Sequence, residues 1–118
     1  MHKINVYGTY STANAADSAT INLKANGTTL LTLVSPTGVV TRKPWHAEMV
    51  VTIREEGVNG NAATFGHIEI DTDVSHGNMY SAHINTTVVN GMGITTKWDT
   101  ANSGNVIRID QGILHVYT

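Results

Sequence analysis

An alternation of apolar residues runs through residues 43–54, KPWHAEMVVTIR, and limits what this chain can fold into. Successive side chains of a strand point to opposite faces of a sheet, so every second residue shares a face. A helix would spread the same residues around its circumference. The stretch therefore predicts a long strand with one face in a hydrophobic core. That face carries Trp45, Ala47, Met49, Val51 and Ile53.

Several other stretches alternate in the same way or lie between turn signals. Asn26-Gly27 is a strong hairpin signal because both residues tolerate positive φ, and residues 90–93 (NGMG) give a second one. Turns are expected at 35–38 and 73–78, and a loop at 55–61. Gly66 is interpreted as the site of a bulge. The expected strands, besides 43–54, are 4–10, 19–25, 28–34, 62–72, 79–89, 94–99 and 105–118.

The last of these stretches, NVIRIDQGILHVYT, changes phase at Gln111-Gly112. A bulge near that point would place the apolar residues before and after it on one face of the strand. We expect that shared face to hold Ile107, Ile109, Leu114 and Val116.

These signals together give about eight strands and no convincing helix. Turn signals recur every 8–12 residues or so, which is typical of an all-β sandwich or barrel. We predict a single domain over residues 1–118, a two-sheet antiparallel β-sandwich of the jelly-roll type. The length of 118 residues is sufficient for one core and too short for two ordinary domains.

Composition excludes several classes of function. The formal net charge is -2 and no run of Lys or Arg is longer than Arg42-Lys43, so we expect no nucleic-acid partner. No apolar stretch is long enough to span a membrane, and the N-terminus has no signal-peptide pattern, so no membrane insertion is expected. The chain contains no cysteine, which excludes disulfides and thiolate metal sites.

The order of these segments resembles a known kind of module. A small-residue loop joins the Asn-Gly hairpin in GTYSTANAADSATINLKANG, the Trp-led strand follows, and the chain closes on IRIDQGILHVYT. This order is similar to the jelly-roll modules at the distal ends of bacteriophage tail fibres and tailspikes. The resemblance implies a homotrimer in the virion tail, acting outside the cell. It also implies a role in fibre-tip assembly, contact with host surface glycans, and neither catalytic residues nor a cofactor.

Several strand faces predicted to lie away from the core lack charge, which favours self-association. A surface depleted of charge is typical of the core of an interface. An ordinary two-sided sheet position explains such a face equally well. The uncharged residues are Thr32, Val50, Thr52, Thr86, Val88 and Thr95.

Saccharide binding is the best-motivated site hypothesis, because sugars are held by aromatic faces together with amides and carboxylates. Trp98, Asp99 and Asn102 supply these groups where a strand meets a loop. Further groups are Tyr80 with Asn78 and His76, and Tyr10 with Tyr7 and Asn14. The competing interpretation of Trp98 is a core residue, since it shares a face with Ile94.

Chemistry at a metal or at paired carboxylates is a weaker hypothesis. HIEID at 67–71, with His46-x-Glu48 and His83-x-Asn85, would offer metal ligands if their strands were neighbours. No His-x-His pair of the cupin type occurs, so we predict no metal. Glu48, Glu69, Asp71 and Asp73 could supply a glycosidase pair, although alternating acids give that spacing on any strand. The alternatives to a tail-fibre module are a free-standing small lectin, a capsid-decoration protein and, less favoured, a cupin-like metalloenzyme.

Overall fold

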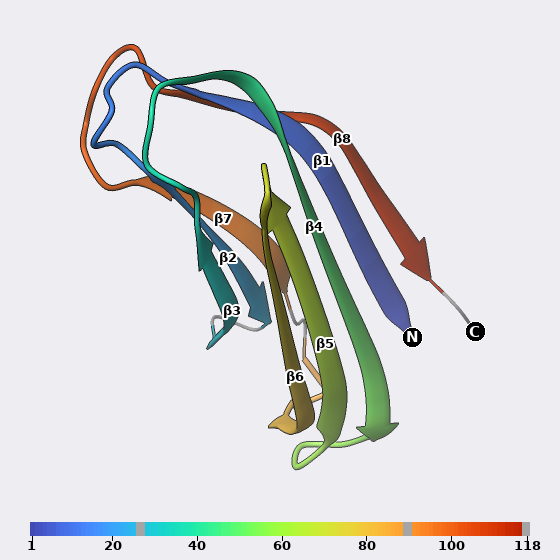
Figure 1. Cartoon of the computed structure of the whole chain (residues 1–118). Coiled ribbons are helices and arrows are strands. Elements are labelled where there is room, and N and C mark those ends of the chain that lie inside the picture. Colours follow the sequence, from blue (N-terminus) through green and yellow to red (C-terminus); the bar gives the residue numbers. More distant parts are fainter. Residues whose placement is uncertain (26–27, 89–90, 117–118) are drawn as a thin grey trace.

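The computed structural model describes residues 1–25, 28–88 and 91–116, with side chains left undescribed at positions 25, 28, 30, 76 and 78–82. Two antiparallel sheets pack face to face as a β-sandwich, which confirms the predicted all-β fold (Figure 1). No helix in the described part of the chain is long and apolar enough to cross a membrane. The strands are β1 (His2–Thr12), β2 (Ala19–Ala25), β3 (Thr28–Val34), β4 (Val40–Glu55), β5 (Asn61–Ile70), β6 (Asp73–His83), β7 (Met92–Trp98) and β8 (Val106–Val116).

The larger sheet has the strand order β6-β5-β4-β1-β8, and the smaller sheet has the order β3-β2-β7. The smaller sheet lies against the β5 and β6 side of the larger one through β3. β4 to β6 are consecutive neighbours in one sheet, and this order does not confirm the jelly-roll connectivity that the resemblance implies. β8 and β7 are edge strands of the two sheets.

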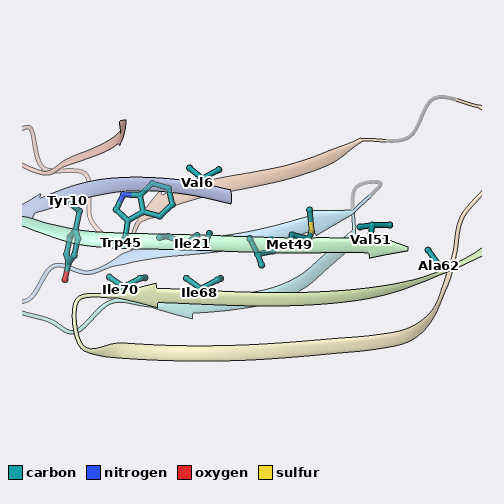
Figure 2. Packing of buried hydrophobic residues seen from close by; sticks show 11 residues of the cluster. Val6, Tyr10, Ile21, Trp45, Met49, Val51, Ala62, Ile68 and Ile70 are labelled. Atoms are coloured by element: carbon teal, nitrogen blue, oxygen red, sulfur yellow. The ribbon is translucent and has the colours of Figure 1, made fainter. Parts of the chain in front are cut away.

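The alternation of β4 is confirmed, because the predicted face is the central lining of the core. Trp45, Ala47 and Met49 are almost inaccessible to solvent, and Val51 is also buried. Side chains of the smaller sheet complete the core from the opposite layer (Figure 2). Burial of apolar surface on this scale is the main force that holds the two sheets together. The other core members are Val6, Tyr10, Ile21, Leu23, Ala62, Ile68 and Ile70.

Gly66 does not mark a bulge, contrary to the prediction. It pairs regularly with Met49 on one side and Gly77 on the other. A Cβ at this position would lie 2.8 Å from Leu23 Cδ1, on the opposing sheet. The missing side chain therefore allows the two layers to approach, and the register between β5 and β6 shifts elsewhere, between Ala62 and Thr64, with the extra residue in β6.

The turn expected at 73–78 is wrong. β5 ends at Ile70, the chain reverses at 71–72, and β6 has already begun at Asp73. Asp71 adopts a φ of 55°, a conformation that Asp tolerates better than most residues. Residues 71–72 thus form the true turn, and Gly77 lies inside a strand.

The hairpin expected at 90–93 is also wrong, since β6 and β7 belong to different sheets and β7 pairs with β2. Residues 89–90 lie outside the described part of the chain, as do residues 26–27 of the Asn-Gly turn. The strands that flank residues 26–27 do pair antiparallel, with Ala25 opposite Thr28.

The phase change in β8 is confirmed. Ile109 lies opposite Gly8 and Gln111 lies opposite Tyr7, which leaves Asp110 as the extra residue. On either side of this bulge, Ile107 faces Tyr10 and Leu114 faces Ile4. Residues that are directly opposite in an antiparallel pair share a face, so the four predicted residues Ile107, Ile109, Leu114 and Val116 lie on the interior face of the sheet.

Candidate functional site

The outer face of the larger sheet carries a band of aromatic and titratable side chains across its three middle strands. Tyr7 of β1 lies opposite His46 of β4, which lies opposite Glu69 of β5. One row along the strands, Asn5 lies opposite Glu48, and Glu48 lies opposite His67. These residues alternate with core residues along each strand. The same alternation that directs the apolar side chains inward therefore places the polar side chains together on the outer face.

The rings in this band are in direct contact. Tyr7 and His46 stack with ring centroids 4.4 Å apart and planes inclined by 6°. His67 meets His46 edge to face at 5.7 Å. Nε2 of His46 lies 3.3 Å from the Asn5 amide oxygen, so the ring N–H can donate to it. The stack is therefore held from both sides while Tyr7 remains 41% exposed.

Burial lowers the pKa of His46 below its ordinary value of 6.5, and the charge of nearby His67 lowers it further. The Glu48 and Glu69 carboxylates oppose this shift without cancelling it. His46 is consequently neutral at pH 7 and contributes a ring face and a hydrogen-bond donor, with no charge.

A hollow of about 170 Å³ lies at the end of this band, beside the turn between β5 and β6. Tyr7, Pro44 and His46 give it apolar and aromatic walls, and Glu69 and Asp71 supply carboxylates. The remaining lining residues are Gly8 and Trp45.

Two contacts position the acidic residues around the hollow, one at the Glu69 side chain and one at the Asp71 backbone. Oε1 of Glu69 lies 3.1 Å from Nε2 of His67. The backbone N–H of Asp71 donates to the Pro44 carbonyl at 2.9 Å, which ties the turn to β4. Glu48 does not line this hollow, and its Oε1 lies 3.6 Å from Nζ of Lys3.

The histidine-bearing strands that could have formed a metal site are in part neighbours. β4 and β5 place His46, Glu48, His67 and Glu69 side by side, whereas His83 lies opposite Asn61 at the far end of β5. Even so, the described residues contain no group of three His, Asp or Glu side chains arranged to hold one ion. What this band offers is hydrogen bonding and stacking.

The structure places Asp99 and Asn102 in a hydrogen-bonded clasp between the loop before β2 and the loop before β8, which also includes Asp17 and Asn105. Oδ1 of Asp99 accepts the Ser18 N–H at 2.9 Å, and Oδ1 of Asn102 accepts the Gly104 N–H at 3.0 Å. Nδ2 of Asn102 lies 3.5 Å from Oδ2 of the buried Asp17. These polar atoms therefore already have partners within the protein.

Trp98 and Tyr10, the aromatic residues of the predicted saccharide groups whose burial is described besides Tyr7, both lie against the core. Trp98 is partly buried and packs against the core from β7, as its competing interpretation predicted. Tyr10 is 1% exposed, so it offers no ring face to a ligand at the surface. Burial raises the pKa of its hydroxyl, and the charge of Asp71 adds to this effect. The side chains of Tyr80, Asn78 and His76 lie outside the described part of the structure.

Sequence reasoning placed Tyr7 in a group with Tyr10 and Asn14, and treated Glu69 and Asp71 only as metal or carboxylate candidates. It did not bring these residues together with Pro44. The signal that could have found them was the pairing of the β1 and β4 stretches, which puts Tyr7 beside His46.

Comparison with known proteins finds no matching family model, and no curated protein or solved structure that is significantly similar to this chain.

Proposed function

We propose that this protein is a non-catalytic structural and binding module, of the kind found at the tip of a phage tail fibre or tailspike. In this proposal it associates with copies of itself as a homotrimer and contacts host surface polysaccharide. The observation that supports it is an apolar surface on the interior face of β8.

The residues of this surface lie on the core-facing side of the sheet, yet they are exposed to solvent. Ile109 and Leu114 are each 61% exposed and Val116 is 59% exposed, although all three share a face with the buried Val6. The larger sheet is two strands wider than the smaller one, and β8 is its edge. In Figure 1 the C-terminal half of β8 lies apart from the three-stranded sheet.

Another copy of the same chain is the occupant that fits this surface best. The interior face of β8 carries no charge, which suits the core of an interface. The strand itself carries one cation, Arg108, and one anion, Asp110, so two copies can meet there without repulsion between like charges. Homo-oligomers are the commonest soluble assemblies, and an uncovered edge strand invites pairing with another chain.

A matched pair of charge substitutions tests this proposal. Leu114→Lys places a charge on the proposed interface, and Val58→Lys places one at an equally exposed position in the loop between β4 and β5. We expect light scattering to show that Leu114→Lys lowers the mass from an oligomer to a single chain of 12.7 kDa, while Val58→Lys keeps the mass of the unmodified protein. An unchanged oligomer in Leu114→Lys would contradict the proposed interface.

A further inference from the structure

We propose that the hollow between Tyr7, Pro44, Glu69 and Asp71 binds one uncharged, hydroxyl-bearing sugar ring of a polysaccharide. This inference deepens the binding half of the proposed function by assigning a site and a ligand class. It concerns the outer face of the larger sheet, whereas the proposed assembly uses the interior face at β8.

The size and walls of the hollow suit a single ring. Its volume of about 170 Å³ is too small for a ligand of drug size and comparable to one monosaccharide. Tyr7 is exposed on the sheet surface and Pro44 is exposed beside it. An aromatic ring and a proline ring together give the apolar surface against which the C–H groups of a sugar ring pack.

The charges around the hollow select among sugars. An ionised carboxylate, as Glu69 and Asp71 can supply, accepts hydrogen bonds and donates none. Carboxylates make strong hydrogen bonds with ligand hydroxyl groups. The lining contains no Lys or Arg, and His46 is neutral at pH 7 for the reason given above. Although Glu69 also contacts His67 outside the hollow, the two carboxylates that line it repel an anionic sugar, so an uncharged ring is the expected ligand.

The groups are held in place before a ligand arrives. Tyr7 is stacked on His46, and His46 is in turn held by Asn5. Asp71 is fixed by its backbone bond to the Pro44 carbonyl and by its place in the turn. A site that is already ordered loses less conformational entropy on binding, which permits measurable affinity for a small ligand.

The test is a titration of the whole chain in solution, in which the backbone amide resonances are monitored. The probes are the methyl glycosides of glucose, galactose, mannose and N-acetylglucosamine, with methyl glucuronide as an anionic probe of the same size. We expect at least one uncharged glycoside to shift the amides of Tyr7, Glu69 and Asp71, and methyl glucuronide to leave them in place. No shift with any uncharged probe, shifts confined to another surface, or equal binding of methyl glucuronide would overturn the proposal.

Two variants and a control separate the site from the rest of the surface. Asp71→Asn keeps a residue that tolerates the φ of 55°, and Glu69→Gln keeps the side-chain shape. Each removes one carboxylate and should weaken binding about tenfold, since a hydrogen bond to a charged group contributes at least about 1.5 kcal/mol. Glu56→Gln, an exposed acid at the opposite end of β5, should change nothing.

Failure of this sugar site can be distinguished from failure of the proposed assembly. Light scattering on the same samples reports assembly independently of the amide shifts. A trimer without sugar binding would overturn only this inference, and a monomer that binds sugar at Tyr7 would overturn only the assembly. Affinity that is unchanged in both carboxylate variants would show that the hollow is not the binding site.

Discussion

Gly8 shows how one residue of β1 determines the packing on the interior face of the larger sheet. The indole of Trp45 crosses this position and donates its Nε1–H to the Arg108 carbonyl at 3.1 Å. A Cβ on Gly8 would lie 2.6 Å from that Nε1 and would collide with the Arg108 carbonyl oxygen. The absence of a side chain therefore allows the largest core residue to reach β8.

Gly8→Ala should lower the free energy of unfolding by about 3 kcal/mol or more, because the clash involves backbone and a fully packed ring. Gly112→Ala on β8 is the matched control, since a Cβ there meets no atom within 4 Å. Its effect should stay within about 1 kcal/mol. Urea unfolding of the two variants measures the difference, and equal midpoints would contradict the packing described for Trp45.

His46 should make stability depend on pH. Its folded-state pKa lies below the ordinary value of 6.5, so the unfolded chain binds a proton more readily than the folded one. Stability from this residue is fully present above pH 6.5 and is lost as the pH falls through the lowered pKa. His46→Gln should flatten the acid side of the stability curve, whereas His83→Gln, an exposed position, should not. Unfolding measured across this range would refute the account if both variants followed the unmodified protein.

At the scale of elements, the loops that precede β2 and β8 are joined through one buried carboxylate. Asp17 is 2% exposed, and its Oδ2 accepts a hydrogen bond from Nδ2 of Asn105 at 2.8 Å. Oδ1 of Asn105 accepts the Ala13 N–H at 3.0 Å. A Cβ on Gly104 would lie 2.5 Å from the Ala13 Cβ, which shows how closely the loops approach. This clasp links strands of the two different sheets.

Asp17→Ala should cost about 2 kcal/mol, because it removes a charged acceptor from the partly buried Asn105 amide, which keeps only the longer bond of 3.4 Å to the Thr100 carbonyl. Glu56→Ala removes an exposed acid and should cost no more than about 0.5 kcal/mol. Thermal unfolding of both variants is sufficient to compare them. A loss for Asp17→Ala no larger than that for Glu56→Ala would show that the clasp contributes nothing.

Alternation in the sequence predicted which residues of β4 and β8 face the interior side of the sheet, because the period of two is a property of each strand alone. It did not predict which strands are neighbours. The NGMG signal at 90–93 has the residues of a tight hairpin, yet β6 and β7 lie in different sheets, and partner choice depends on the whole core. The candidate site was missed for the same reason, since Tyr7 and Glu69 meet only after β1, β4 and β5 have been placed in order.

At the scale of the whole molecule, the unequal width of the two sheets is the decisive feature. Five strands face three, so the interior face of β8 has apolar residues and little to cover them. The charge-poor residues noted in the sequence do not form this surface. Val50 lies on the outer face of β4, and Thr32 and Thr95 lie on the outer face of the smaller sheet. Exposure of β8 could not be predicted from the chain because it depends on the width of the opposing layer.

The central claim is that copies of this chain cover the interior face of β8, and sedimentation equilibrium of the unmodified protein at micromolar concentration tests it most directly. The proposal predicts a species of three times 12.7 kDa that persists on dilution through this range. A single chain of 12.7 kDa at every concentration, with a native fold, would contradict it.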